Sequence, residues 1–375
     1  MNPITAAEGM RVVNDTSFPT KYWQALPDGR VQCDTCPHHC RLQDGQRGIC
    51  FVRACRNGQI VLTTYGRSSG FCIDPIEKKP LNHFLPGTAI LSFGTAGCNL
   101  TCKFCQNWHL SRSREMETLA AEADPETIAR AAHRRGCRSV AFTYNDPVVF
   151  LEYAVDVARA CHAVGVKTVA VTAGYMCAEP RRDFYAHMHA ANVDLKGFTE
   201  DFYRKFCGAQ LQPVLDTLVY LVRETKVWLE ITTLLIPGAN DSETEIDALT
   251  KWIARELGPH VPLHFTAFYP AWQLTDHRPT PPATLQRARQ IAMQNGLHYV
   301  FTGNVRDRTG AATYCPACGR VVIGRDGYNI TAWNLTKGAR CGFCAAAIAG
   351  VFEAQPGAWN GACAPVDIGA FAQPE

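Results

Sequence analysis

Three cysteines, Cys98, Cys102 and Cys105, lie within eight residues at C-x3-C-x2-C spacing, in the run GCNLTCKFCQNWH. Three thiolates this close together can hold three corners of a 4Fe–4S cluster, for which a complete set would be four. The fourth iron would then be open to an outside ligand, as is typical of catalytic rather than structural metal sites. The alternative is three ligands of a zinc site, for which His109 is the one further ligand at short spacing.

Two more groups of cysteines have the spacing of metal ligands. Near the C-terminus, two C-x2-C pairs separated by 22 residues predict a structural zinc site of the zinc-ribbon type, with a second iron–sulfur cluster as the alternative: Cys315, Cys318, Cys341 and Cys344. Near the N-terminus, a C-x2-C-x3-C-x9-C pattern predicts a site for zinc or an iron–sulfur cluster: Cys33, Cys36, Cys40 and Cys50. His38 or His39 could replace one of these ligands.

Composition sets the remaining limits. The chain has 375 residues, 18 of them cysteine, and a formal net charge of +3, which is too small to indicate binding to nucleic acid or to an acidic membrane. Residues 1–17 contain no apolar core of signal-peptide length, and no segment is long and apolar enough to span a membrane. We therefore expect a cytoplasmic protein whose cysteines bind metal rather than form disulfides. Four isolated cysteines are expected to be buried and inert: Cys137, Cys161, Cys177 and Cys207.

Strand and helix patterns alternate through the middle of the chain. Apolar runs predict strands at residues 90–93, 139–143, 166–171, 193–195, 228–236, 263–268 and 298–302. Helices are predicted between them, among them one after Asp124 and Pro125, one over 147–164 and one that ends near Gly258. This order predicts an α/β fold with a partial (β/α)6-type barrel over residues 86–305. A cysteine-rich N-terminal module (1–85) and a zinc-ribbon-like C-terminal module (311–375) would flank it, the latter after a linker at 306–310.

Polar residues follow the predicted strands, as a binding site at the mouth of a barrel requires. The second strand is followed by Tyr144-Asn145-Asp146, the third begins its loop with Thr172, and the fourth ends in Asp194-Leu195-Lys196. In a site of low dielectric constant, the Lys196 ammonium could pair with a carboxylate, although a solvated lysine has the same pattern. Asp146 could bind a cofactor, cap the helix that begins at Pro147, or do both.

Several of these motifs together resemble one family. VQCDTCPHHC, GCNLTCKFCQNW, FTYNDPVVFLEY, DLKGF, LLIPGANDSETEI and FTGNV, with the cysteine-rich C-terminus, are similar to the radical S-adenosylmethionine (SAM) enzymes of the AmmeMemoRadiSam system. These are relatives of the pyruvate formate-lyase activating enzymes. The resemblance covers most of the chain.

The resemblance implies a 4Fe–4S cluster on the central cysteine triad, with SAM bound at its open iron. Reductive cleavage of SAM would then yield a 5′-deoxyadenosyl radical that abstracts hydrogen from a substrate. It also implies cofactor contacts from the residues named at the strand ends, of which Asp194 and Lys196 resemble the pair that holds the methionine end of SAM. Activating enzymes carry a ribose-binding histidine near the end of the sixth strand; here His264 lies earlier in that strand.

The resemblance further implies partners. The substrate is expected to be a peptide or protein, the electron donor a flavodoxin or ferredoxin, and the neighbouring gene products Memo-like and AMMECR-like proteins. Two alternatives remain open at this point, a small-metabolite substrate and the activation of a glycyl-radical enzyme.

Overall fold

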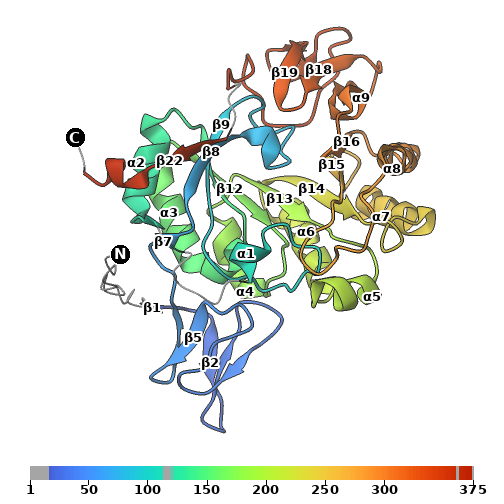
Figure 1. The fold of residues 1–375 in the computed structure, drawn as a ribbon. Coiled ribbons are helices and arrows are strands. Elements are labelled where there is room, and N and C mark those ends of the chain that lie inside the picture. The colour runs from blue at the N-terminus through green and yellow to red at the C-terminus, as the bar shows by residue number, and fades with distance from the viewer. Residues whose placement is uncertain (1–16, 113–118, 120, 360–362, 374–375) are drawn as a thin grey trace, which may run out of the picture.

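A nine-stranded sheet forms the centre of the molecule (Figure 1). The computed structural model describes residues 17–112, 119, 121–359 and 363–373. The sheet has the strand order β16-β15-β14-β13-β12-β11-β9-β8-β22, with seven parallel strands followed by the antiparallel β8 and β22. Its strands are β8 (Phe71–Pro75), β9 (Ala89–Phe93), β11 (Ser139–Phe142), β12 (Lys167–Thr172), β13 (Ala190–Asp194), β14 (Trp228–Leu235), β15 (Leu263–Ala267), β16 (Val300–Gly303) and β22 (Ala364–Val366).

All seven predicted strands are present, and the predicted α/β fold with a mostly parallel sheet is confirmed. Strands β9 and β15 are buried along their whole length, as parallel strands covered on both faces are. Within the part of the chain that the structure describes, β16 pairs only with β15, and β22 pairs only with β8. The sheet therefore stays open between these two edges.

Helices connect the parallel strands. They are α2 (Pro125–Arg134), α3 (Leu151–Ala163), α4 (Ala178–Tyr185), α5 (Glu200–Phe202), α6 (Gln212–Glu224), α7 (Glu243–Glu256) and α8 (Pro282–Gln294), with short turns η3 (Pro147–Phe150) and η4 (Tyr203–Cys207). The predicted start of α2 is confirmed, since the Asp124 side chain accepts a hydrogen bond from the Thr127 backbone N–H at 2.6 Å. Helices α2 and α3 lie beside one end of the sheet, and α7 and α8 lie beside the other (Figure 1).

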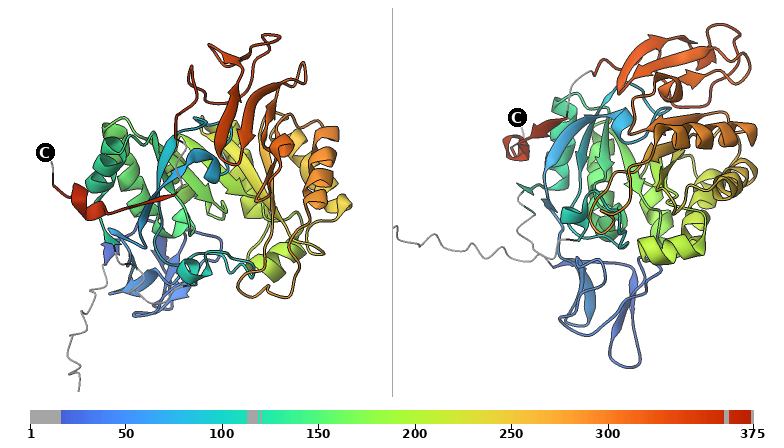
Figure 2. Two further views of the ribbon diagram at one scale, coloured as in Figure 1. Left: turned by 45° about the horizontal axis from the view of Figure 1, so that its top comes forward. Right: turned by 45° about the vertical axis from the view of Figure 1, so that its right-hand side comes forward.

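Two small lobes flank the sheet, one from each end of the chain (Figure 2). The N-terminal lobe contains β1 (Phe18–Pro19), β2 (Trp23–Ala25), β3 (Val31–Cys33), β4 (Arg41–Leu42), β5 (Arg53–Arg56) and β6 (Gln59–Leu62). The C-terminal lobe contains β17 (Thr313–Tyr314), β18 (Val321–Asp326), β19 (Asn329–Trp333), β20 (Leu335–Thr336) and β21 (Arg340–Cys341). The remaining elements are β7 (Arg67–Ser68), β10 (Ala121–Glu122), η1 (Ile76–Lys78), α1 (Trp108–Ser111), α9 (Arg308–Ala311) and η5 (Ile368–Phe371).

Three expectations need correction or qualification. The segment predicted as a linker, 306–310, partly forms α9. Cys72 and Cys363 form a disulfide with a Cα–Cα distance of 6.2 Å, where no disulfide was expected. This bond joins β8 and β22, two strands that the predicted three-part division placed outside the barrel; the division itself stays a prediction.

Residues 1–16, which bear on the expected lack of a signal peptide, lie outside the described residues. Among those that are described, no helix has the length and apolar character to cross a bilayer.

The segment from η1 to Leu85 packs against four of the parallel strands, where its apolar residues form one cluster with Ile90, Ala141, Val169 and Ala190. The Glu230 carboxylate on β14 holds this segment in place. It accepts backbone N–H bonds from Asn82 at 3.0 Å and His83 at 2.7 Å, and bonds from the rings of Trp228 and His264 at 3.0 and 2.7 Å. Burial opposes ionisation of Glu230, but His264 and these donors outweigh it and lower the carboxyl pKa.

We expect Glu230→Ala to destabilise the protein by about 3 to 5 kcal/mol, because it leaves three buried donors and the half-buried Trp228 ring without their acceptor. Since the folded-state pKa lies below the usual value, this stabilisation is complete at neutral pH and is lost only as the pH falls below about 4. Anaerobic thermal and urea unfolding at pH 7 would measure it. Glu224→Ala on the exposed face of α6 is the control with little expected change, and equal losses in the two variants would contradict the prediction.

Candidate active site

The three clustered cysteines lie in the loop between β9 and α1, at the carboxyl end of the sheet. Asn145, which follows β11, fixes the start of this loop. Its Nδ2 donates to the carbonyl oxygens of Ala96 at 3.1 Å and Gly97 at 2.8 Å, and its Oδ1 accepts from the Thr95 N–H at 2.9 Å. Asn145 is 6% exposed. The amide therefore satisfies buried backbone groups that no secondary structure pairs.

Glycines allow the loop to come this close to its neighbours. A Cβ at Gly94 would overlap the Thr143 carbonyl oxygen, and one at Gly97 would overlap the Cys50 carbonyl oxygen. Gly97 also has a φ of +77°, which favours glycine. The cysteine loop is thus held between the end of β11 and the N-terminal lobe.

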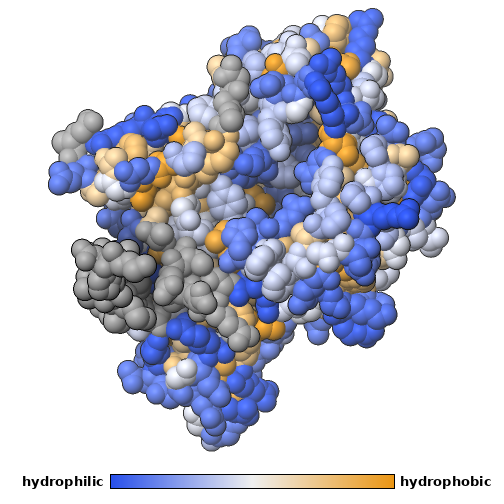
Figure 3. All heavy atoms as spheres, viewed as in Figure 1, coloured by the Kyte–Doolittle hydropathy of each residue, from blue (hydrophilic) through white to orange (hydrophobic). Residues whose placement is uncertain are grey.

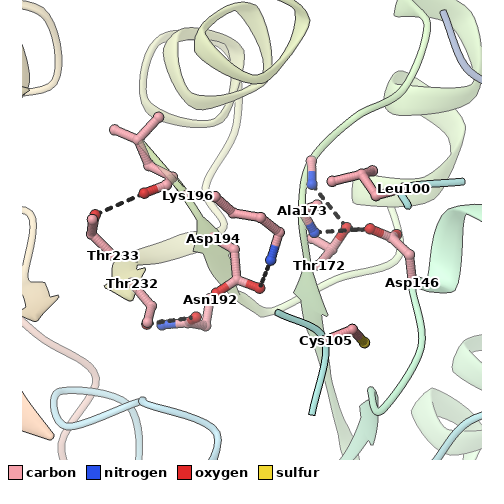
Figure 4. Close-up of polar contacts among 12 residues, drawn as sticks. Leu100, Cys105, Asp146, Thr172, Ala173, Asn192, Asp194, Lys196, Thr232 and Thr233 are labelled. Carbon is pink, nitrogen blue, oxygen red and sulfur yellow. Dashed lines mark hydrogen bonds and ion pairs between the residues drawn. The ribbon is translucent and has the colours of Figure 1, made fainter. Parts of the chain in front are cut away.

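A cavity of about 240 Å³ opens at this end of the sheet. Cys98, Cys102 and Cys105 line it together with residues at the ends of the strands. In Figure 4, Asp194 and Lys196 lie on one side, and Cys105, Asp146 and Thr172 lie on the other. The other lining residues are Leu100, Phe104, Gln106, Asn107, Ser111, Thr143, Tyr144, Asn145, Asp146, Val171, Thr172, Ala173, Asp194, Lys196, Thr232, Leu234 and Thr266. The structure therefore brings the predicted triad and most of the predicted cofactor residues together.

Asp146 bridges two neighbouring strand ends. Its carboxylate accepts bonds from the Thr172 hydroxyl and the Ala173 N–H, both at 2.9 Å, and from the Val148 N–H at 3.1 Å (Figure 4). Burial raises its pKa, against the effect of these donors. The predicted role of Asp146 as a helix cap is confirmed, since it caps η3.

Asp194 and Lys196 form an ion pair on the opposite wall of the cavity. Lys196 Nζ lies 3.0 Å from Asp194 Oδ2, with side-chain exposures of 16% and 34% (Figure 4). Burial disfavours the ammonium, but Asp194 and the thiols of Cys102 and Cys207 outweigh it and raise the Lys196 pKa. The site thus holds one fixed cation beside one carboxylate that is open to the cavity.

Tyr144 connects the cavity to β8. It has a φ of +70°, its hydroxyl donates to Asp74 Oδ2 at 3.1 Å, and its carbonyl oxygen accepts from Asn107 Nδ2 at 2.9 Å. Asp74 is itself paired with Lys79 at 2.7 Å. Burial is the largest cause of the raised pKa of the Tyr144 hydroxyl, which keeps it a hydrogen-bond donor.

His264, the predicted ribose contact, does not line this cavity. Its Nε2 bonds to Glu230, and its side chain lines a second cavity of about 630 Å³ between the barrel and the C-terminal lobe. Thr266, two residues further along β15, lines both cavities, so they adjoin. Figure 3 shows hydrophilic residues around the hollow below the C-terminal lobe.

The C-terminal cysteines have the geometry of a metal site. The Sγ atoms of Cys315 and Cys344 are 3.6 Å apart, those of Cys318 and Cys341 are 3.7 Å apart, and all four lie within 4.8 Å of one another. Four thiolates in contact suit a tetrahedral ion.

Three of the isolated cysteines are buried as predicted, but Cys177 is half-buried, with its Sγ 3.8 Å from His39 Nε2. Cys207, which does not line the cavity, is the largest cause of the raised pKa of the Cys102 thiol, followed by burial.

Comparison with known proteins decides the family. A model described as the radical SAM superfamily matches residues 93–249. An uncharacterized protein of Methanocaldococcus jannaschii is 39% identical over 324 residues, which cover 86% of this chain and 96% of that protein. The chain belongs to the radical SAM superfamily. It is therefore an enzyme, and its superfamily implies a 4Fe–4S cluster and SAM.

Relatedness to activating enzymes appears in the same comparisons. The pyruvate formate-lyase-activating enzyme of Clostridium pasteurianum is 26% identical over 163 residues, or 42% of this chain and 66% of that protein. Among solved structures, a domain of such an enzyme from Bacteroides vulgatus has a TM-score of 0.40 at 19% identity, covering 44% of this chain and 99% of that one. A radical SAM methyltransferase from Sphaerobacter thermophilus has a TM-score of 0.46 at 18% identity, covering 64% and 71%.

The residues present fit the expected cofactors. The lining of the cavity includes the thiols of Cys98, Cys102 and Cys105 and does not include Cys207. Three thiolates would hold three irons of a 4Fe–4S cluster and would leave the fourth iron open to SAM. Sequence reasoning missed Thr232, Leu234 and Thr266, which alternate with outward-facing residues along β14 and β15; that alternation was the available signal.

We expect Asn145→Ala to reduce stability by about 2 to 3 kcal/mol, because buried backbone groups at residues 95–97 lose their partners. Hydrogen exchange at residues 95–98 should rise sharply, measured by mass spectrometry under anaerobic conditions. Asn107→Ala, which removes a single bond to the Tyr144 carbonyl, is the matched control with a smaller effect. Unchanged exchange in Asn145→Ala would show that the amide does not hold the loop.

Proposed function

We propose that this radical SAM enzyme abstracts a hydrogen atom from a peptide or protein substrate. The observation that carries the proposal is the second cavity of about 630 Å³, which adjoins the first through Thr266. It lies beside β16, an edge strand of the open sheet, so an extended segment has a route to the reacting centre. A small metabolite would need only the smaller cavity.

In this proposal, Cys98, Cys102 and Cys105 hold the 4Fe–4S cluster. The chemistry that a bound cluster and SAM supply is reductive cleavage of SAM and abstraction of hydrogen by the resulting 5′-deoxyadenosyl radical. Asp194 would receive the amino group of SAM and Lys196 its carboxylate, because these two charges line the same cavity as the three thiols. Asn145 is then a positioning residue for the loop rather than a contact.

Asp146, Thr172 and Tyr144 would shape the remaining wall. Asp146 already accepts three hydrogen bonds, so we propose that it fixes the Thr172 loop and presents a negative charge to the methionine end of SAM. Tyr144 would exclude water on the side nearest Asp74. His264 is hydrogen-bonded to Glu230 and lines the second cavity, so it would contact the substrate there and not the ribose of SAM.

The larger cavity offers contacts suited to a peptide. Exposed tyrosines, Tyr269 and Tyr328, and charged groups of both signs, among them Arg306, Arg308 and Asp326, line it. Such side chains can bond backbone carbonyl and N–H groups of a bound segment. The sequence likeness to a pyruvate formate-lyase-activating enzyme makes activation of a glycyl-radical protein a second candidate of the same class.

The finer assignments follow from the resemblance. We propose that the chain belongs to an AmmeMemoRadiSam system with Memo-like and AMMECR-like partners, and that a flavodoxin or ferredoxin supplies the electron. We also propose zinc at the C-terminal thiols, because thiolates 3.6 and 3.7 Å apart are spaced as around a single tetrahedral ion.

Replacing Lys196 by methionine should weaken SAM binding by about ten-fold to a hundred-fold, since it removes a charged partner of the carboxylate, while iron content stays unchanged. Equilibrium binding of SAM and iron analysis of the same samples would measure both. Lys103→Met removes an exposed charge from the same loop, outside the cavity lining, and serves as the control. Loss of iron with SAM affinity unchanged would contradict the assignment.

The substrate class can be tested with deuterated peptides derived from proteins encoded beside this one. Deuterium should pass into 5′-deoxyadenosine, as measured by mass spectrometry. Arg306→Ala, in the second cavity, should raise KM for the peptide with little change in kcat, because the side chain is 85% exposed and does not line the cavity of the cysteine triad. Arg320→Ala, on the same lobe but outside that cavity, is the control. Label transfer from a free metabolite and from none of the peptides would overturn the proposal.

A further inference from the structure

The four N-terminal cysteines converge on a small buried cavity. Cys33 and Cys50 are buried and Cys36 and Cys40 are half-buried, although 16 residues of chain separate the first from the last. The cavity is lined by these four residues together with Thr35, Gly48, Ile49, Arg53, Asn99, Val148 and Val149. Four thiols therefore surround a space that other parts of the chain close off.

The spacing of these thiols distinguishes them from the C-terminal group. At the C-terminus, all four Sγ atoms lie within 4.8 Å of one another. Among the N-terminal cysteines, all of which the structure describes, no three Sγ atoms meet that limit. A single zinc ion with Zn–S bonds of about 2.3 Å needs its thiolates nearly in contact. A 4Fe–4S cluster carries each thiolate on a separate iron, which sets the thiolates further apart around a central space.

The two histidines nearest these cysteines in the sequence do not reach the cavity. His38 Nε2 lies 2.7 Å from the Asn99 carbonyl oxygen, and His39 Nδ1 lies 2.7 Å from Asp34 Oδ1. Neither histidine lines the cavity. The donor set is therefore four cysteines, which is the complete set for a 4Fe–4S cluster.

The surroundings suit a buried anionic group. Arg53, at 2% exposure, lines the cavity, where its guanidinium offsets thiolate charge. Its orientation is fixed by two bonds to Glu152, at 3.1 and 2.5 Å, and one to the Val149 carbonyl oxygen at 3.2 Å. The Val148 and Val149 side of the cavity is apolar.

We propose that Cys33, Cys36, Cys40 and Cys50 bind a second 4Fe–4S cluster with no open iron, beside the catalytic one. The two cysteine groups touch through their backbones, since Gly97 packs on the Cys50 carbonyl and Asn99, next to Cys98, lines the N-terminal cavity. The half-buried Cys36 and Cys40 mark the side nearest solvent. The second cluster relays one electron from an external flavodoxin or ferredoxin to the catalytic cluster, so the donor is oxidised by one electron and no proton moves.

The triple variant Cys98→Ala/Cys102→Ala/Cys105→Ala tests the site with its four ligands intact. After anaerobic reconstitution it should keep about four iron and four sulfide per chain, an absorbance band near that of other 4Fe–4S proteins, and an electron paramagnetic resonance signal on reduction. Zinc should amount to about one per chain, from the C-terminal thiols. About two zinc and no iron per chain would overturn the proposal.

Variants that remove the proposed N-terminal ligands provide the complementary test. Adding Cys36→Ser/Cys40→Ser to the triple variant should remove the remaining iron, whereas adding Cys55→Ser should not, because Cys55 is buried in the same lobe but does not line the cavity. Retention of iron in the first combination would place the cluster elsewhere.

The relay is tested in the otherwise native chain. Cys36→Ser/Cys40→Ser should lower the ratio of flavodoxin-driven to dithionite-driven SAM cleavage, and an unchanged ratio would overturn the relay. None of these measurements involves the substrate. Their results therefore test the second cluster independently of the proposed peptide modification.

Discussion

Parallel hydrogen bonding among β9, β11, β12 and β13 is the constraint on which the site depends. Parallel strands end at the same edge of a sheet, so the loops that follow them meet there. The cysteine loop, Asp146, Thr172 and Lys196 come from four such loops and face one cavity. A shift of one residue in any of these pairings would turn the side chains at that strand end to the other face.

A few side chains convert this general layout into a defined site. The Asn145 amide hydrogen-bonds to the backbone of the cysteine loop, and the Asp146 carboxylate hydrogen-bonds to the neighbouring loop after β12. Both are buried, so their bonds form in a medium of low dielectric constant, where they are strong and costly to break. The cofactor contacts are left to groups with more freedom, above all Asp194 and Lys196.

The two ends of the chain do more than flank the barrel. The N-terminal lobe packs Cys50 against Gly97 in the cysteine loop, and Arg325 of the C-terminal lobe donates at 2.6 Å to the Asn82 carbonyl, in the segment held by Glu230. Strands β8 and β22 also extend the central sheet. Changes at either end can therefore reach the active site through buried contacts.

The sequence by itself determined the seven parallel strands and the helices between them, the caps at Asp124 and Asp146, and the catalytic class, because these depend on local periodicity and on cysteines within eight residues of one another. Only the tertiary structure paired Cys72 with Cys363, across 291 residues, turned His264 to Glu230 and assigned Asn145 to the loop backbone. The structure also showed that the Sγ atoms of the C-terminal cysteines lie closer together than those of the N-terminal cysteines, a difference that spacing in the sequence could not show. The sequence identifies which cysteines can act as ligands. The distances between their Sγ atoms, which determine whether a zinc ion or an iron–sulfur cluster fits, depend on how distant segments pack.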